Sequence, residues 1–187
     1  AGPIMASADT FKLEILGKGG HGAQPQETID PIPIGSLIVE NLQHMVSREN
    51  SPINPMVVSI TAFNSGSSEN VIPEKAELLG TCRTFDNDLR EKFPEMMERI
   101  IKGIVEAHRG DYKFTYYKGT PATINEEESV ELGRKVVGEI IGQENIIYQD
   151  PQMGGEDFAT YLINIPGCLM FLGGKVEGST APHHTEE

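Results

Sequence analysis

The order in which strand-like and helix-like segments follow one another constrains this chain more than any other feature of its sequence. Apolar and polar residues alternate, as in half-buried strands, over residues 11–15, 58–62, 74–85 and 112–116. Apolar residues recur at helical spacing over residues 31–47 and 89–105. The resulting order, β-α-β-β-α-β, is the ferredoxin-like or split β-α-β pattern. It predicts an α+β fold in which two helices pack on one face of an antiparallel four-stranded sheet.

Short signals at the ends of these segments support the same order. Asp30 followed by Pro31 is typical of a helix start, since aspartate accepts hydrogen bonds from free backbone N–H groups and proline fits the first turn. Either Asp86 or Asp88 is expected to cap the second helix. Residues 17–22 include four glycines and predict a flexible loop after the first strand.

The pattern changes after Gly119. A helix is predicted over 129–141, a short strand over 146–148, a helix start at 153–158 and a strand buried on both faces at 168–172. This second segment has too little patterned apolar surface to be stable as a domain by itself. The sequence therefore predicts a linker at 1–8, a ferredoxin-like domain at 9–118 and an incomplete α/β segment at 119–187.

Composition limits the classes of partner. The net charge of −13 argues against nucleic acid, because an acidic surface repels phosphate. An RNA-binding sheet of the same topology would need a basic face with exposed aromatic residues. No apolar run reaches the ~18 residues that span a bilayer, and the N-terminal residues do not resemble a signal peptide. The isolated Cys82 and Cys168 favour free thiols in a reducing compartment, so a cytoplasmic protein is expected.

Three polar residues of the first domain are candidates for binding or catalysis. His21 lies in the glycine-rich loop, where a ligand can approach the backbone and an imidazole can donate a hydrogen bond or a proton. A surface histidine in a mobile loop is the alternative. Asn70 and Arg83 flank the turn at Pro73, and an amide and a planar guanidinium suit a carboxylate. A turn asparagine and a surface arginine would give the same pattern.

The second segment offers further candidates. His183 and His184 precede Glu186 and Glu187, and imidazole and carboxylate groups are common ligands of zinc and related metals. A tail without a fixed conformation explains the same residues, because a zinc site requires about four ligands. Glu156 lies where a helix is expected to start, so it either lines a site or only stabilises a helix N-terminus.

Taken together, these stretches resemble one enzyme family. The chain is similar to the zinc-dependent aminoacylase and carboxypeptidase-like amidohydrolases of clan MH. It is most similar to the branch with hippurate hydrolase, N-acyl-amino-acid amidohydrolases and the hydrolases of indole-acetyl amino acid conjugates. The matching stretches occur in the family's order and cover nearly the whole chain. They are residues 17–25, 70–73, 80–85 and 153–158, and the terminal His183-His184.

The resemblance implies a catalytic domain into which a β-α-β-β-α-β domain is inserted as a lid and dimerisation surface. His21 resembles the lid histidine that reaches the active site of the partner subunit and polarises the scissile carbonyl. Asn70 and Arg83 resemble the lid residues that hold the substrate carboxylate or amide, so that the three side chains would clamp one substrate. Glu156 resembles an acid that lines the site. His184, or else its neighbour His183, resembles the C-terminal metal ligand.

The implied activity is metal-dependent hydrolysis of an N-acyl amino acid or a small peptide amide by a homodimer. Two divalent metal ions (zinc, or manganese, cobalt or nickel) would lower the pKa of a bridging water toward ~7. The family's Cys-Gly-His-Asp motif, its Glu-Glu pair and its third histidine belong upstream of the lid and are absent from these 187 residues.

We therefore expect a piece of the enzyme, in which 119–187 is part of the metal-binding catalytic domain. Such a piece supplies the lid and one metal ligand, binds no metal stably and is inactive alone. A non-catalytic ferredoxin-like module for dimerisation or small-molecule binding is the alternative.

Overall fold

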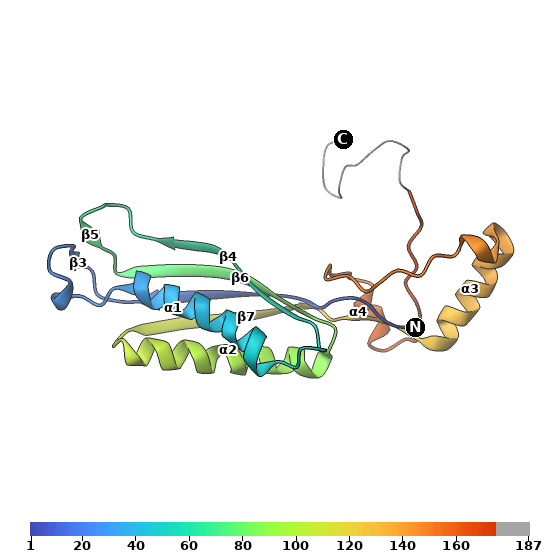
Figure 1. The fold of residues 1–187 in the computed structure, drawn as a ribbon, viewed down its shortest axis with the longest axis horizontal. Helices are drawn as coiled ribbons and strands as arrows, with labels where there is room; N and C mark the ends of the chain where they lie inside the picture. The colour runs from blue at the N-terminus through green and yellow to red at the C-terminus, as the bar shows by residue number, and fades with distance from the viewer. Residues whose placement is uncertain (175–187) are drawn as a thin grey trace.

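The computed structural model describes residues 1–174, which form an elongated molecule (Figure 1). We call residues 8–120 the sheet domain and residues 121–174 the tail. The strands are β1 (Gly2–Met5), β2 (Ala8–Leu16), β3 (Gly20–His21), β4 (Met56–Ser65), β5 (Val71–Ile72), β6 (Lys75–Thr84), β7 (Asp111–Thr120) and β8 (Thr123–Asn125). The helices are α1 (Pro31–His44), α2 (Asn87–Ala107), α3 (Glu127–Ile141) and α4 (Ala159–Leu162), with shorter turns η1 (Pro25–Glu27), η2 (Met45–Glu49) and η3 (Gln143–Asn145).

The sheet domain has the predicted topology. Its strands lie in the order β4-β6-β2-β7, and each neighbouring pair is antiparallel. Helices α1 and α2 contact each other and pack on the same face of the sheet. The α+β class and the β-α-β-β-α-β order predicted from periodicity are therefore confirmed.

One face of the sheet forms the core with the two helices. Alternate residues of β2 and β6 are buried, as expected for a sheet with one covered face. Phe93 and Met97 of α2 and Ile38 of α1 are fully buried against these strands. The core residues are Phe11, Leu13, Ile15, Ile34, Ile38, Leu42, Met45, Met56, Val58, Ala76, Leu78, Cys82, Phe93, Met97, Ile101 and Val105.

The opposite face of the sheet carries charged side chains. Lys12 Nζ lies 2.6 Å from Glu77 Oε2, and Lys75 Nζ lies 3.1 Å from Glu14 Oε1. The hydrogen bond to Glu77 raises the pKa of Lys12, and the hydrogen bond from Lys75 lowers the pKa of Glu14. Exposed ion pairs of this kind add little stability. The charges instead keep this face compatible with water, so the domain has a single core.

Both long helices begin at aspartate caps. Asp30 caps α1 as predicted. Of the two residues proposed for α2, Asp86 is the cap, since its carboxylate accepts the N–H groups of Asp88 and Leu89 at 2.8 and 3.0 Å. The Asn54 amide also donates to Asp86 at 2.7 Å. The hydrogen bonds from Leu89 and Asn54 lower the pKa of Asp86.

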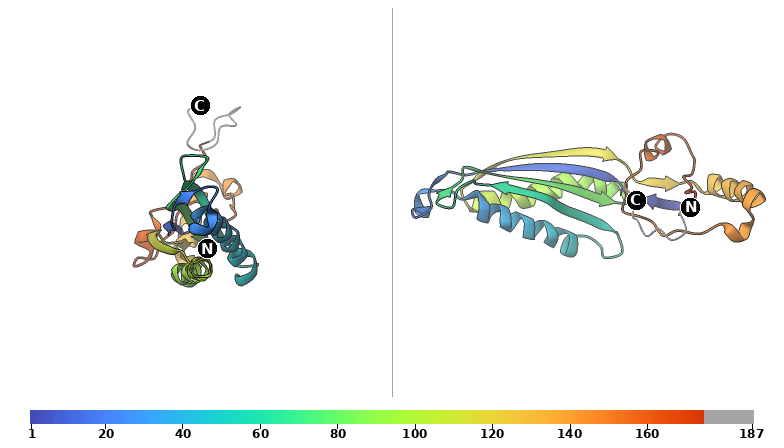
Figure 2. Two further views of the ribbon diagram at one scale, coloured as in Figure 1. Left: turned by 90° about the vertical axis from the view of Figure 1, so that its left-hand side faces the viewer. Right: turned by 90° about the horizontal axis from the view of Figure 1, so that it is seen from above.

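A short ribbon extends the sheet at each end. At one end, which we call the tip, β3 pairs with β5, so that His21 lies opposite Val71. At the other end, which we call the base, β1 pairs with β8 beyond the sheet (Figure 2, right). Residues 1–8, expected as a linker, therefore contain a strand. Periodicity gave no signal for it, because apolar and polar residues do not alternate over Gly2–Met5.

The tail differs from its predicted elements in two places, since residues 146–148 and 168–172 form no strand. The helix start expected at 153–158 corresponds to the short α4, whose N-cap is Phe158. Phe171 and Leu172 are 50% and 95% exposed, so the apolar run at 168–172 has no sheet within the described part of the chain to join. The predicted helix at 129–141 is confirmed, as α3.

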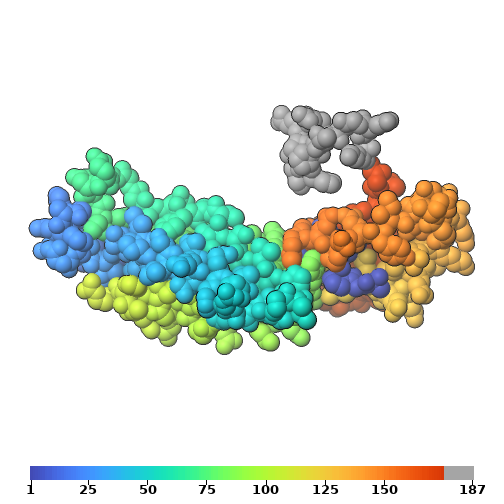
Figure 3. All heavy atoms as spheres, viewed as in Figure 1, coloured from blue at the N-terminus to red at the C-terminus, as the bar shows by residue number. Residues whose placement is uncertain are grey.

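Helix α3 presents an apolar stripe to solvent. Its residues Leu132, Val136 and Ile140, spaced four apart, are all exposed. The helix lies at the end of the molecule opposite the tip (Figure 3). No helix within residues 1–174 is both long enough and apolar enough to cross a membrane.

Replacing Asp86 by alanine is expected to lower the free energy of unfolding by about 1–2 kcal/mol, because the first N–H groups of α2 lose their acceptor. Since folding lowers the pKa of Asp86 from 3.8, the contribution is present above that value and is lost as the pH falls through the folded pKa. In urea unfolding, the difference in free energy of unfolding between the wild type and Asp86→Ala should therefore be smaller at pH 3 than at pH 7.

Asp88→Ala is the matched control. Asp88 lies in the same first turn but accepts none of these N–H groups, so its loss should cost about 0.5 kcal/mol or less through the helix dipole alone. Equal losses in the two variants would contradict the assignment of the cap to Asp86.

Candidate functional site

The tip brings His21 and Asn70 together. The Gly22 N–H donates to the Asn70 carbonyl oxygen at 2.8 Å, next to the ribbon of β3 and β5. A Cβ at position 22 would lie 3.1 Å from that oxygen, so glycine allows the two loops to approach. Both His21 and Asn70 are exposed. Their side chains can therefore reach a group that lies outside this chain.

Local hydrogen bonds orient the two polar groups. Nδ1 of His21 accepts the Ala23 N–H at 3.0 Å, so Nε2 carries the proton of the neutral ring. Oδ1 of Asn70 accepts the Ser68 hydroxyl at 2.9 Å, which leaves the NH₂ group of Asn70 as a donor. The tip thus presents two hydrogen-bond donors, His21 Nε2 and Asn70 Nδ2.

Arg83 lies near the base, away from the other two candidates. Strand β6 runs from Lys75 beside the tip to Thr84, and at about 3.3 Å per residue Arg83 is roughly 26 Å beyond Lys75. Nη1 of Arg83 lies 3.3 Å from the place that a Cβ on Gly155 would occupy. Within residues 1–174, Arg83 takes part in no ion pair. Its charge is therefore available to an anion.

Glu156 belongs to the same end of the molecule as Arg83. The neighbouring Gly155 packs against Ala8 and Thr120 at the base. Glu156 is half-buried, and its Oε1 accepts the Phe158 N–H at 3.3 Å. The candidates thus fall into two groups, with His21 and Asn70 at the tip and Arg83 and Glu156 near the base. One chain does not bring all of them to one point.

Metal binding is not explained by the described residues. His183 and His184 lie outside them. Within residues 1–174, no three His, Cys, Asp or Glu side chains gather closely enough to hold a metal ion. Burial raises the pKa of Cys82 to about 12, so this residue is a neutral thiol at pH 7 and not a nucleophile.

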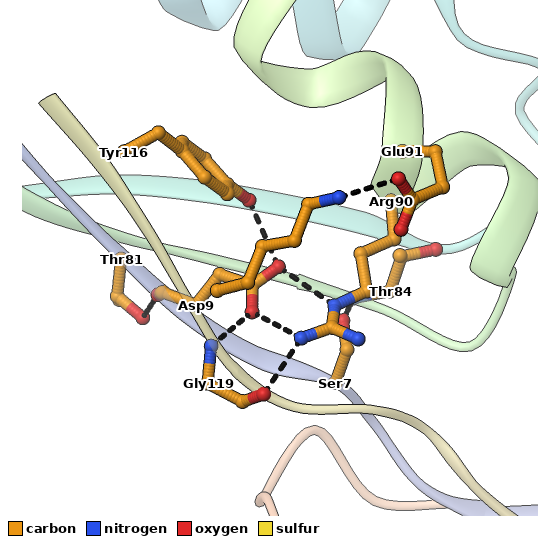
Figure 4. Close-up of polar contacts among 9 residues, drawn as sticks. Ser7, Asp9, Thr81, Thr84, Arg90, Glu91, Tyr116 and Gly119 are labelled. Atoms are coloured by element: carbon orange, nitrogen blue, oxygen red, sulfur yellow. Dashed lines mark hydrogen bonds and ion pairs between the residues drawn. The ribbon is translucent and has the colours of Figure 1, made fainter. Parts of the chain in front are cut away.

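A buried polar cluster at the base was missed by the sequence predictions (Figure 4). The fully buried carboxylate of Asp9 accepts hydrogen bonds from Nε and Nη2 of Arg90, on α2, at 2.9 and 2.7 Å. The Tyr116 hydroxyl donates to Asp9 at 3.0 Å and the Gly119 N–H at 2.8 Å. Burial raises the pKa of Tyr116, which keeps it a donor. The sequence does contain one indication of this cluster. Asp9 is a charged residue at a position of β2 that alternation with Phe11 and Leu13 predicts to be buried.

The sheet domain is thus a ferredoxin-like α+β domain whose tip presents two exposed hydrogen-bond donors. Residues 6–109 match the peptidase dimerisation domain. The N-acyl-L-amino acid amidohydrolase of Geobacillus stearothermophilus is 51% identical over 127 residues, which cover 68% of this chain and 34% of that protein. The hippurate hydrolase of Campylobacter jejuni is 38% identical over 161 residues, covering 86% of this chain and 42% of that protein.

A solved structure agrees with these relatives. The Bacillus subtilis YXEP protein, described as a dinuclear metal binding peptidase from the M20 family, has a TM-score of 0.71 and 34% identity, covering 89% of this chain and 40% of that one. The chain therefore belongs to the M20 family of peptidases and amidohydrolases, which confirms the resemblance drawn from its motifs. It spans 44%, 34% and 47% of the length of three curated relatives, which is less than half of each.

Gly155→Ala is expected to loosen the tail from the base, because the new Cβ would lie 2.6 Å from Ala8 Cβ and 3.3 Å from Arg83 Nη1. The Ala6 N–H donates to the carbonyl oxygens of Gln152 and Gly154 at 3.0 and 2.9 Å, so its hydrogen exchange reports this contact. We expect exchange at Ala6 to become about tenfold faster or more.

Gly154→Ala is the control, since its Cβ would meet only the flexible end of the Met5 side chain, at 2.8 Å. Equal exchange rates at Ala6 in the two variants would show that the close approach of Gly155 does not hold the tail.

Proposed function

We propose that this chain is the lid and part of the catalytic domain of a metal-dependent amidohydrolase that cleaves an N-acyl amino acid or a small peptide amide. Two relatives, an N-acyl-L-amino acid amidohydrolase and a hippurate hydrolase, support this reaction class. The observation that carries the proposal is the division of the candidate residues between the tip and the base of one sheet. The proposed domains are a connection at 1–8, the lid at 9–118 and the catalytic-domain part at 119–187.

The division of the candidates supports a site that two protomers share. Along β6, Arg83 is roughly 26 Å from the tip, which is farther than a small acyl amino acid can span. If these residues act on one substrate, Arg83 of one protomer binds it together with His21 and Asn70 of another. A homodimer with two-fold symmetry provides this arrangement, because each tip serves the other protomer's base. The match to a dimerisation domain supports such a pair.

Each side chain has a distinct task in the proposed reaction. The Arg83 guanidinium binds the substrate carboxylate through two parallel hydrogen bonds and so orients the scissile amide. His21 of the other protomer donates from Nε2 to the carbonyl oxygen as negative charge develops there, which for a single donor contributes about 3–4 kcal/mol. Asn70 Nδ2 holds the acyl or carboxylate oxygen beside it. Glu156 lines the base of the site.

Two divalent metal ions are proposed for the intact enzyme, with His184, or else His183, as the ligand supplied by this chain. The description of the YXEP protein as dinuclear metal binding supports the number. Zinc, manganese, cobalt and nickel all accept imidazole ligands. Residues 1–174 provide no ligand set, so the remaining ligands belong to the family motifs that this sequence lacks. By itself the 187-residue chain is then inactive.

We place the intact enzyme in the cytoplasm. Cys82 and Cys168 are both free, and a reducing compartment keeps such thiols from pairing.

Subunit mixing tests the shared site. In the intact enzyme, His21→Ala should lower kcat, and Arg83→Ala should raise KM mainly for substrates with a free carboxylate. When the two variants are refolded together, half of the dimers are mixed and each carries one complete site. At substrate concentrations far below the KM of the Arg83 variant, about a quarter of the wild-type activity should therefore return.

Refolding each variant alone is the control and should not raise its activity under the same conditions. If the mixture is no more active than the single variants while mixed dimers form, the two residues act in the same protomer and the shared site is wrong. Equal loss on amide-capped substrates in Arg83→Ala would contradict its role at the carboxylate.

The β4 edge of the sheet, with the adjoining side of α1, is the surface we propose for dimerisation. Strand β4 spans ten residues as an edge with unpaired backbone groups. Ile32 is 40% exposed, on the side of α1 from which Gln43 donates to the Val58 carbonyl of β4. Phe63 of β4 is also exposed. The other edge, β7, lies beside the strongly charged α2.

Ile32→Glu should raise the dimer dissociation constant of the intact enzyme about tenfold or more, because a charge would have to be buried at the interface. Tyr117→Glu, on the β7 edge, is the control, since Tyr117 is similarly apolar and 54% exposed. Sedimentation equilibrium measures both. Dissociation of the Tyr117 variant with retention of the Ile32 dimer would move the interface to the opposite edge.

A further inference from the structure

We propose that the buried Asp9–Arg90 pair is a positioning element that sets the direction in which the sheet domain leaves the tail. In the intact enzyme the pair would thereby align the tip with the substrate of the other protomer. This last step rests on the proposed function. The effect on direction does not, since it concerns only residues described here.

The pair holds three elements at one point. Asp9 is the second residue of β2 and accepts hydrogen bonds from Nε and Nη2 of Arg90, on α2, at 2.9 and 2.7 Å. Arg90 Nη2 also donates to the Gly119 carbonyl oxygen at 2.8 Å, and the Gly119 N–H donates back to Asp9 at 2.8 Å. Both backbone groups of Gly119, near the end of β7, are thus fixed by the ion pair (Figure 4).

Gly119 lies in an irregularity of the ladder between β2 and β7. Ala8 pairs with Thr120, whereas Thr10 pairs with Tyr117, so β7 has one residue more than β2 at this point. An extra residue of this kind bends its strand and increases its twist. A Cβ on Gly119 would lie 2.0 Å from the Ala8 carbonyl oxygen, so the bend is closely packed. The Asp9–Arg90 pair therefore holds the bend in shape.

Both connections between the sheet domain and the β1–β8 ribbon pass through this bend. The residues on either side of it are buried, among them Ala6, Ser7, Ala122 and Thr123. The tail packs directly on it, because a Cβ on Gly155 would meet Ala8 at 2.6 Å and Thr120 at 3.3 Å. The shape of the bend consequently sets the angle between the sheet and the tail.

Stability alone does not explain the pair. A buried ion pair is often no more favourable than apolar residues of the same volume, because both charges lose their hydration. A planar guanidinium that contacts a carboxylate and a carbonyl together fixes orientation in a way that apolar contacts do not. Lysine at position 90 would keep the charge and lose that fork.

Distance measurements between spin labels test the direction. Labels on cysteines introduced at the exposed Ser68, near the tip, and Glu131, on α3, report the angle in the 187-residue chain with Cys168→Ser. We expect Arg90→Lys and Asp9→Asn to broaden the distance distribution about twofold or to shift its centre, with unchanged circular dichroism. Tyr116→Phe removes one hydrogen bond to Asp9 and provides a milder variant should the others fail to fold.

Glu91→Gln is the matched control, because Glu91 follows Arg90 and forms an exposed ion pair with Lys118 across the same bend. The distribution of label distances in Glu91→Gln should equal that of the wild type. Unchanged distributions in all folded variants of Asp9, Arg90 and Tyr116 would overturn the inference.

Kinetics of the intact enzyme test the second step. If the pair positions the lid, Arg90→Lys should lower kcat per folded molecule about tenfold or more, with KM changed less than about threefold. A merely structural role would lower the melting temperature and leave kcat per folded molecule intact. A changed distance with unchanged kcat would overturn the link to the reaction. Absence of amidohydrolase activity in the wild type would instead refute the proposed function and leave the distance result standing.

Discussion

One buried ion pair controls the end of the sheet at which the chain enters and leaves it. The Asp9 side chain has no exposed surface, and an ionised carboxylate removed from water costs several kcal/mol unless its partners are in place. Arg90, Tyr116 and the Gly119 N–H supply those partners. They come from α2 and β7, while Asp9 lies near the start of β2, so the need to satisfy one carboxylate joins three elements in a single arrangement. The rest of the sheet domain extends from that point.

The single covered face gives the domain its shape. Helices α1 and α2 bury one side of four strands, and the charges of Lys12 and Glu77 keep the other side in water. Strands β4, β6 and β7 have ten residues each, so the sheet is long enough for its two ends to carry different functional groups far apart. Donors lie at one end, and near the other lies the guanidinium of Arg83, which forms no ion pair within residues 1–174. In the proposed dimer, two copies of the domain bring these complementary ends together, which one copy cannot do.

Much of this arrangement could be predicted from sequence, because alternation and helical spacing depend on near neighbours. Those patterns gave the sheet topology, the Asp30 cap and the stripe that includes Phe93. They did not separate Asp86 from Asp88, since only the loop contact with Asn54 and the helix N–H groups distinguish them. The β1–β8 ribbon and the Asp9–Arg90 pair join distant segments, which no local period reveals. In the tail, the apolar run at 168–172 suggested a strand, but a strand also needs a neighbouring strand to pair with.

For the candidate site, the motif order indicated His21, Asn70 and Arg83. The distance between Arg83 and the other two could not be predicted, because it depends on the direction and length of β6 in the folded sheet.

The length of the sheet also makes the tip a lever. At roughly 26 Å from the base, a rotation of about 2° at the bend moves His21 by about 1 Å, and a misplacement of that size can reduce a rate about 10²-fold. In the proposed enzyme, a substitution near Gly119 that leaves the melting temperature unchanged would therefore still lower turnover. Selection at the base should then act more strongly on the angle between the sheet and the tail than on the melting temperature. A screen that measures only folding would therefore overlook the most damaging substitutions.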